Sequence, residues 1–194
     1  LLWEISAQLN WIDPFFFASP TNVVICFWDL LLNGDLLTHT FITLLETIVS
    51  FTLVFLFSLL TSTLLWYSQR LSDIIEPYLV ILNSLPKSAL APLFIVWLGT
   101  GIKTIIVAGI SVAIFGSIIS FYTGFKQVDP EKITLIYTLG GNKKDAFSKV
   151  VLPGSVPILI STTKVNIGLA LVGVIIGEFL AARTGLGYLI IYGS

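Results

Sequence analysis

The sequence predicts an all-α protein that crosses a membrane several times, with about four complete spans in a helical bundle. Of its 194 residues, 56% are hydrophobic and only 11% are charged, whereas a typical soluble domain has roughly 25% charged residues. The apolar residues also gather in separate runs, each long enough to cross about 30 Å of hydrocarbon. We therefore treat residues 1–194 as one transmembrane domain.

Residues 4–41 are expected to lie outside the membrane or along its surface. Ser19 and Pro20 are typical of a helix N-cap and first turn, and Asn33-Gly34 is typical of a helix end. The apolar run Val23 to Leu32 between them has ten residues, which is about 15 Å of helix and too short to span. We predict an interfacial helix here.

Four longer apolar runs are predicted to be membrane-spanning helices. They cover residues 42–67, 78–98, 105–122 and 156–182. Pro86 and Pro92 interrupt the second run, and carbonyl groups freed by a proline are tolerated only where protein or a water-filled cavity satisfies them. We therefore expect this broken span inside the bundle, either as a kinked packing helix or as a wall of a polar path.

The two ends of the sequence lead us to expect a fragment of a longer protein. The chain begins within an apolar phrase, contains no methionine, and ends soon after another apolar stretch begins. Residues 186–194 are expected to start a further span or a re-entrant segment, which gives about five to six spans in the full chain.

Basic residues indicate the side of the membrane on which each loop lies. Six of the ten Lys and Arg residues follow the first span or lie between the third and fourth spans. Residues 1–41 contain four acidic residues and no Lys or Arg. By the positive-inside rule, residues 123–153 form a cytoplasmic loop and the first residues lie outside.

The cytoplasmic loop is predicted to fold as two short helices at an angle. Asp129-Pro130-Glu131 combines an N-cap, a proline at the first helical position and an acid at the positive helix end. Gly140 and Gly141 end this helix, Asn142 caps a second one, and Pro153 is expected to end the second. Helices this short are unstable alone in water, so their apolar side chains must pack against something.

Several classes of function find no support in the sequence. There is no G-x-x-x-x-G-K-[ST] phosphate loop, so we expect no ATP site in this chain, and no cofactor is implied. The net charge of −1 argues against a nucleic-acid partner. The single histidine, His39, is interpreted as a capped, solvated side chain and not as a metal ligand. No catalytic set of residues gathers at one membrane depth.

The loop and its flanks resemble one family of membrane proteins. The spacing from Gly140 to Leu152-Pro153, with an aliphatic residue at Val150, is similar to the cytoplasmic loop of binding-protein-dependent ABC importer permeases. The stretches NSLPKSALAPLFIVWLGTG (83–101), GEFLAARTGLGYLI (177–190) and DPFFFASP (13–20) resemble the branch that imports nitrate, taurine, aliphatic sulfonates and some vitamin precursors. In one departure, residues 134–136 are Thr-Leu-Ile where the family has Glu-Ala-Ala, so an acidic contact is absent or shifted to Glu131.

The resemblance implies a type I ABC importer permease in the bacterial cytoplasmic (inner) membrane. It also implies four partners: a cytoplasmic ABC ATPase dimer, a second permease copy in a homodimer, an extracytoplasmic substrate-binding protein, and lipid. The residues expected to couple to the ATPase are Glu131, Gly140, Gly141, Lys143, Phe147, Val150, Leu152 and Pro153. Phe147 is expected to be the largest apolar anchor for the ATPase, with the lysines at the rim of the contact.

Four residues of the spans are candidates for a translocation path: Pro86, Lys87, Lys164 and Glu178. Charged side chains are costly at membrane depth and by default mark a functional or paired site. Lys87 and Glu46 lie near span ends, where long side chains can reach water, so Lys164 and Glu178 are the stronger candidates. Gly173-x-x-x-Gly177 allows two helices to approach closely, either within the subunit or across a dimer.

Two other classes remain open from the sequence alone. A secondary transporter is expected to carry broken helices at corresponding positions of two repeats, whereas one broken span is visible here. An intramembrane enzyme would need a catalytic constellation. The transported solute is not determined by the sequence, because in the resembled family a separate binding protein carries most of the selectivity.

Overall fold

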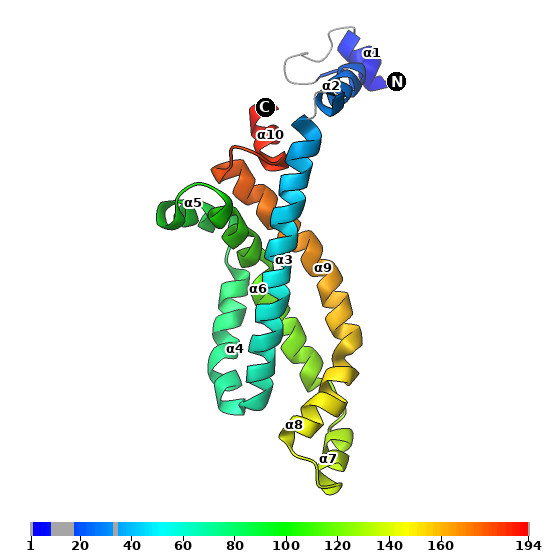
Figure 1. Cartoon of the computed structure of the whole chain (residues 1–194), viewed down its shortest axis with the longest axis vertical. Helices are drawn as coiled ribbons and strands as arrows, with labels where there is room; N and C mark the ends of the chain where they lie inside the picture. Colours follow the sequence, from blue (N-terminus) through cyan, green and yellow to red (C-terminus); the bar gives the residue numbers. More distant parts are fainter. Residues whose placement is uncertain (1, 9–17, 33–34, 194) are drawn as a thin grey trace.

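The computed structural model describes residues 2–8, 18–32 and 35–193, and in these ranges the chain is helical with no strand (Figure 1). The helices are α1 (Leu2–Gln8), α2 (Pro20–Leu32), α3 (Asp35–Tyr67), α4 (Gln69–Ser84), α5 (Lys87–Leu98), α6 (Ile102–Lys126), α7 (Pro130–Thr138), α8 (Lys143–Ala146), α9 (Leu152–Ala181) and α10 (Leu186–Gly193). A π-helical turn, Phe147–Val151, joins α8 to α9.

Among the described residues, three helical stretches are long and apolar enough to cross a membrane: Leu36–Tyr67, Ile102–Lys126 and Lys143–Ala181. The bent pair α4 and α5 is a fourth candidate. All three long helices extend beyond the residues 42–67, 105–122 and 156–182 on at least one side, because their polar end turns continue the helix after the apolar run has stopped.

The second predicted run, 78–98, differs most from the structure. Its helix begins at Gln69, with the Ser68 hydroxyl accepting a hydrogen bond from the Leu71 N–H at 3.3 Å. The charged first turns of α4 hid this start from a search for apolar runs. The helix ends at Ser84, Leu85 is extended as a residue before proline should be, and α5 leaves at 97°. Pro92 lies inside α5 without ending it.

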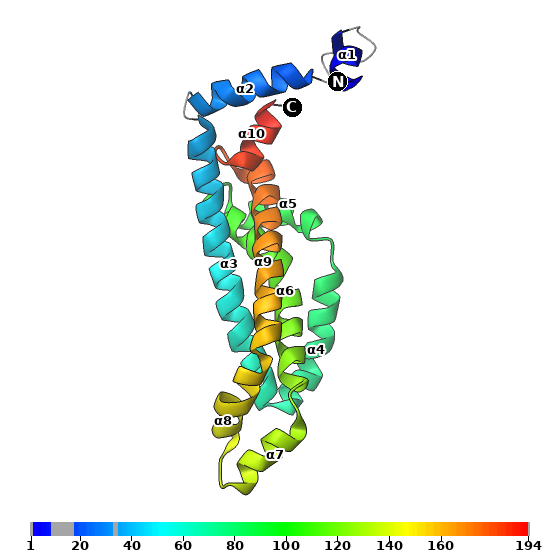
Figure 2. The same ribbon diagram turned by 90° about the vertical axis from the view of Figure 1, so that its right-hand side faces the viewer.

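The core of the bundle is formed where α6 packs against α9 and α3 (Figures 1 and 2). A Cβ added at Gly173 of α9 would lie 2.8 Å from the Gly109 Cα of α6, and one at Gly177 would lie 3.0 Å from the Ile105 Cα. Only glycine permits such close backbones. The Gly173-x-x-x-Gly177 pattern therefore serves a contact within this subunit.

Small hydroxyl residues join α3 to α6. Ser50 and Ser58 are fully buried, and their hydroxyls each donate to a carbonyl of α6, Ile106 and Ile114 respectively, at 3.4 Å. The two serines lie about two helical turns apart, so they form one stripe along α3. Hydrogen bonds and close packing are what hold helices together where the surroundings are as apolar as the core.

The first helices lie at one end of the bundle, with α2 running across the end of α3 (Figure 2). The Ser19 hydroxyl accepts from the Asn22 N–H at 3.2 Å, which confirms the predicted N-cap. None of the residues of α2 is buried, as an interfacial helix requires. The predicted stop Asn33-Gly34 and most of the DPFFFASP stretch lie outside the described residues.

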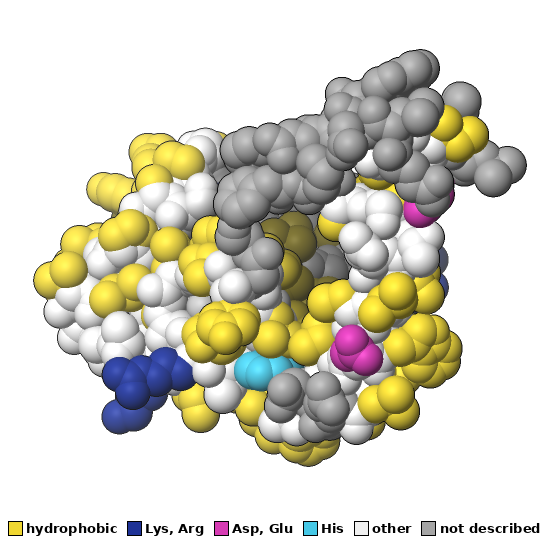
Figure 3. All heavy atoms as spheres, turned by 90° about the horizontal axis from the view of Figure 1, so that it is seen from above, with side chains coloured by type: hydrophobic (Ala, Val, Ile, Leu, Met, Phe, Trp, Pro, Cys, Tyr) yellow, Lys and Arg dark blue, Asp and Glu magenta, His cyan; other side chains and the backbone are white. Residues whose placement is uncertain are grey.

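The outer surface of the bundle is apolar. Seen from above, hydrophobic side chains cover much of the visible surface (Figure 3). On α3, for example, Leu56, Phe57 and Leu60 are all more than half exposed. A surface of this kind is expected of helices in contact with lipid or with other spans.

Candidate functional site

The connection between α6 and α9 is built from two capped helices at the lower end of the molecule (Figure 1); we call residues 129–151 the α7–α8 hairpin. The Asp129 carboxylate accepts from the Glu131 N–H at 2.9 Å. The Asn142 side chain accepts from the Asp145 N–H at 3.0 Å, while Asp145 accepts from the Asn142 N–H at 3.1 Å. This reciprocal capping box confirms both predicted helix starts.

The turn between α7 and α8 depends on its two glycines for different reasons. Gly140 has φ +80°, a left-handed conformation that favours glycine. A Cβ at Gly141 would lie 2.5 Å from the Ile136 side chain and 2.9 Å from the Ile136 carbonyl oxygen. The turn is therefore fixed by backbone angle at Gly140 and by space at Gly141.

Pro153 does not end the second helix, contrary to the sequence prediction. Residues Lys143–Ala181 form one continuous helical stretch of 39 residues. In its π-helical turn, the Leu152 N–H donates to the Phe147 carbonyl five residues earlier. Pro153 then falls in the first turn of α9, where a missing N–H is tolerated. The second half of the hairpin, α8 with the π-helical turn, is thus continuous with α9.

Phe147 packs against three aromatic rings of its own chain, whereas the sequence analysis expected it to be an anchor for the ATPase. Its ring centroid lies 5.1 Å from that of Trp66, 5.5 Å from that of Tyr67 and 5.3 Å from that of Phe125. Trp66 and Tyr67 end α3, and Phe125 lies near the end of α6. Aromatic rings at these distances stabilise one another, so Phe147 fastens the hairpin to the spans of its own chain.

Lys143 adds a second link between the hairpin and α3. Its ammonium donates to the Tyr67 carbonyl at 2.7 Å and lies 5.5 Å from the centre of the Trp66 ring. The last carbonyls of a helix lack partners within the helix and carry its negative end. Lys143 therefore satisfies the end of α3, whereas the sequence analysis expected the lysines at the rim of a partner contact. Lys144 is exposed.

The exposed large apolar side chains of the hairpin are Leu135, Tyr137 and Leu139, with exposed fractions of 57%, 45% and 75%; Leu135 and Leu139 lie on one side of α7 and Tyr137 on the other. We call these three residues the exposed apolar face. Among the other predicted coupling residues, Glu131 and Pro153 are exposed, and Val150 and Leu152 are half-buried. The sequence analysis did not select this face. Leu135 and Leu139 are four residues apart in a helix that precedes a polar turn. This spacing places both leucines on one side of the helix and could have identified them from the sequence.

Lys164 is exposed on α9, two residues before Asn166, which lines a groove between α6 and α9. The groove has a volume of about 260 Å³, and its polar lining comes from Ser120, Ser161, Thr162 and Asn166. The Asn166 side chain is 2% exposed, and its Nδ2 has no hydrogen-bond partner in the described structure. A polar patch therefore lies in the middle of α9, at a depth where polar groups are costly.

Pro86 and Lys87 lie at the bend between α4 and α5. The Lys87 ammonium hydrogen-bonds the Asn83 carbonyl, one of the acceptors left open at the end of α4. Lys87 thus has a local partner at the break in the span.

Glu178 is buried within the chain, with an exposed fraction of 1%. One oxygen accepts from the Thr43 hydroxyl and the other from the Gly187 N–H, both at 2.7 Å. The carboxylate therefore holds the start of α10 against α3 and α9. This position differs from that of an exposed residue on a path.

His39 takes part in the same junction. Its Nδ1 accepts from the Gly185 N–H at 2.7 Å, and the Leu186 N–H donates to the Thr43 hydroxyl at 2.9 Å. His39 is therefore half-buried and held by this hydrogen bond, whereas the sequence analysis expected a solvated side chain. Gly185, at φ +112°, turns the backbone so that successive N–H groups face α3 and α9.

These features define a multi-pass α-helical membrane protein with buried charges tied into helix junctions and an exposed apolar hairpin. Residues 54–194 match the family of binding-protein-dependent transport system inner membrane components. The chain belongs to this family of ABC importer permeases, and it is a multi-pass inner-membrane protein.

Three relatives match almost the whole chain. A formylaminopyrimidine transport permease protein, ThiX, of Halalkalibacterium halodurans is 29% identical over 97% of this chain and 74% of its own length. A "Probable ABC transporter permease protein" of Haemophilus influenzae is 31% identical over 100% and 78%. A Bacillus subtilis permease named for aliphatic sulfonates transport, SsuC, is 26% identical over 97% and 68%.

Proposed function

We propose that this chain forms the translocation path for a small solute in an ABC importer and couples transport to a separate cytoplasmic ATPase. A second permease copy and an extracytoplasmic substrate-binding protein would complete the assembly. The family to which the chain belongs supports this class of function.

The observation that carries the proposal is the continuity of the α7–α8 hairpin with the spans. Residues Lys143–Ala181 are one helical stretch, and Phe147 and Lys143 attach its first turns to the end of α3. A force applied to the hairpin therefore reaches both α9 and α3 through covalent helix and packed aromatic rings. A solvated loop without these links would move without displacing α9 or α3.

The exposed apolar face, Leu135, Tyr137 and Leu139, is the surface that we propose for ATPase contact. Buried aromatic and aliphatic anchors provide most of the energy of such interfaces. Within the predicted coupling set, Gly140 and Gly141 shape the turn that presents this face. Phe147, Leu152 and Lys143 connect it to the bundle, and Glu131, Val150 and Pro153 lie around the connection.

The translocation path is proposed to run along the polar side of α9. Lys164 and the groove at Asn166 support this position, because unpartnered polar groups in a span are expected to face water. Relatives are named for formylaminopyrimidine and for aliphatic sulfonates, so we limit the proposal to a small organic solute or small anion.

The test is co-purification of the ATPase with a Tyr137→Ala/Leu139→Ala double variant. We expect ATPase association to weaken by about 2 kcal/mol or more, because two anchors are lost from the contact. The control is Leu60→Ala, which removes a leucine of α3 that is 59% exposed and should leave association unchanged. Full ATPase retention by the double variant, or solute uptake without ATP hydrolysis, would contradict the proposal.

A further inference from the structure

A pocket of about 470 Å³ lies between the end of α6, the first turn of α7 and the π-helical turn that leads into α9; we call it the Lys132–Lys149 pocket. Among the residues that line it, the only charged ones are Lys132 and Lys149. The uncharged lining residues are Gln127, Val128, Val150, Pro153 and Gly154. None of the roles proposed above uses the two lysines.

Both lysines are available to a further group. Lys132 and Lys149 are exposed, and Lys132 makes no ion pair with a described residue. Lys149 forms an ion pair with Asp145 at 3.0 Å, yet its side chain is still 67% exposed. An ammonium has three N–H donors, and water weakens an exposed ion pair. The contact with Asp145 therefore leaves Lys149 able to bind another anion.

The acidic residues nearest in the sequence do not line the pocket. Asp129 and Glu131 precede Lys132, but neither is a lining residue. The Asp129 carboxylate caps α7 by accepting from the Glu131 N–H, and Asp145 takes part in the capping box of α8. The lining therefore has two positive charges and no negative charge, and this favours an anion.

The pocket lies where the polar end of the bundle meets its apolar surface. α6 ends at Lys126, and α7 and α8 project beyond the spans at the lower end of the molecule (Figure 2). In the next turns of α9, Val156 and Ile160 are 42% and 51% exposed. They follow Pro153 by three and seven residues, which places all three on one side of α9. Lysines at this level can reach lipid phosphate groups, and the apolar residues above them can contact acyl chains.

We propose that the Lys132–Lys149 pocket binds the phosphate group of an anionic phospholipid in the cytoplasmic leaflet. The two ammonium groups donate to phosphate oxygens, which is the contact that a free phosphate ion would also make. The apolar side of α9 that continues from the pocket favours the lipid, because only a lipid has acyl chains to cover it. Basic pockets beside spans on the cytoplasmic side suit anionic headgroups. This inference does not rest on the proposed ATPase contact, because neither lysine belongs to the exposed apolar face.

The test compares dioleoylphosphatidylglycerol, dioleoylphosphatidylcholine and inorganic phosphate. The complete permease chain, purified in a neutral detergent without its ATPase, is titrated with each probe, and bound molecules are counted by native mass spectrometry. We expect phosphatidylglycerol to bind about tenfold or more tightly than phosphatidylcholine, whose choline group cancels the phosphate charge. Inorganic phosphate at equal concentration should not displace phosphatidylglycerol. Equal binding of the two lipids, or full displacement by phosphate, would overturn the proposal.

Matched charge variants locate the lipid in this pocket. Lys132→Gln/Lys149→Gln should bring phosphatidylglycerol binding to within about threefold of phosphatidylcholine binding, because both charges are lost. Lys132→Arg/Lys149→Arg should keep the preference, since arginine retains the charge. Arg70→Gln/Lys144→Gln removes two charges from exposed positions outside the pocket and should bind as the native chain does. A loss of preference as large in this control as in the Lys132→Gln/Lys149→Gln variant would mean a diffuse surface attraction and would contradict the assignment.

ATPase retention distinguishes a lipid from an acidic group of a partner protein. The Lys132→Gln/Lys149→Gln variant should co-purify with as much ATPase as the native permease. Tyr137→Ala/Leu139→Ala should instead lose ATPase and keep its preference for phosphatidylglycerol, so failure of the ATPase contact and failure of the lipid site give different results. If Lys132→Gln/Lys149→Gln loses ATPase and keeps the lipid preference, the pocket binds the partner protein and the proposal is overturned.

Discussion

At the scale of single residues, Glu178 illustrates how a costly buried charge can have a structural role. The sequence marks it as a path candidate because an acid in a span is expensive. In the structure, Thr43 and Gly187 each donate a hydrogen bond to it at 2.7 Å. These donors come from α3, 135 positions away, and from the first turn of α10, nine positions away, so no local pattern identifies them.

We predict that Glu178→Ala destabilises the chain by about 2–4 kcal/mol, because two buried donors lose their acceptor. The measurement is thermal unfolding of the purified chain, with Glu76→Ala on α4 as the control that removes an acid outside the junction. A structural role requires that transport and stability fall together. If Glu178→Ala abolishes transport but has the same unfolding temperature as the native chain, Glu178 belongs to the path instead.

At the scale of the helices, the sequence predicts a start well where a capping residue marks it. The caps at Ser19, Asp129 and Asn142 depend on residues within a few positions, and hydrogen bonds confirm all three. The same local rules predict that the helix ends at Pro153. That prediction is wrong, because the preceding π-helical turn places Pro153 at a position where its missing backbone N–H is not needed for a helical hydrogen bond. The bend at Pro86 could be expected from the sequence, whereas the angle of α5 depends on packing against α6 and α9.

The packing of Phe147 gives a prediction that distinguishes binding of the ATPase from transmission of motion between the hairpin and the spans. Phe147→Ala removes three ring contacts with α3 and α6, which we expect to loosen the hairpin by about 2 kcal/mol. The exposed face at Tyr137 and Leu139 is left intact. ATPase retention should therefore change less than in the Tyr137→Ala/Leu139→Ala variant, while hydrolysis stimulated by the binding protein should fall several-fold.

Two measurements on the same preparation decide this prediction: the amount of ATPase that co-purifies, and the hydrolysis rate with and without binding protein. Phe147→Leu, which keeps much of the apolar volume, serves as the conservative control. A loss of ATPase from Phe147→Ala as large as that from the double variant would place Phe147 in the partner contact. Unchanged stimulation would mean that the aromatic link does not transmit motion.

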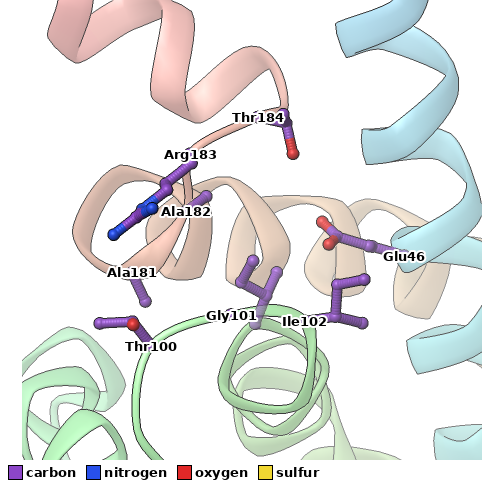
Figure 4. A pocket seen from close by; sticks show the side chains of 9 residues that line it. Glu46, Thr100, Gly101, Ile102, Ala181, Ala182, Arg183 and Thr184 are labelled. Atoms are coloured by element: carbon purple, nitrogen blue, oxygen red, sulfur yellow. The ribbon is translucent and has the colours of Figure 1, made fainter.

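At the scale of the whole molecule, three of the polar features lie far apart. The α7–α8 hairpin lies at one end, the cavity lined by Glu46 and Arg183 (Figure 4) lies toward the other, and Lys164 and the Asn166 groove lie between them on α9. Sequence reasoning identified the hairpin and Lys164 from charge and spacing. It could not identify the groove or the cavity, because each is lined by side chains from separate helices that come together only on folding.

The exposure of Lys164 leads to a prediction about selectivity. A lysine that faces water attracts anions only weakly, because solvent and salt screen a single exposed charge. The polar lining of the neighbouring groove consists of uncharged Ser, Thr and Asn side chains, which accept many solutes. Lys164→Ala should therefore change the uptake rate by less than about tenfold and should keep the order of preference among solutes. Exchanging the binding protein should change that order.

The measurement is competitive uptake into proteoliposomes of a small sulfonate and an aminopyrimidine, with native permease or Lys164→Ala and with each of two binding proteins. Lys164→Gln, which keeps the length of the side chain without the charge, separates charge from volume. If Lys164→Ala alone reverses the preference while the binding protein is held constant, the permease carries the selectivity, and the weak-attraction argument fails.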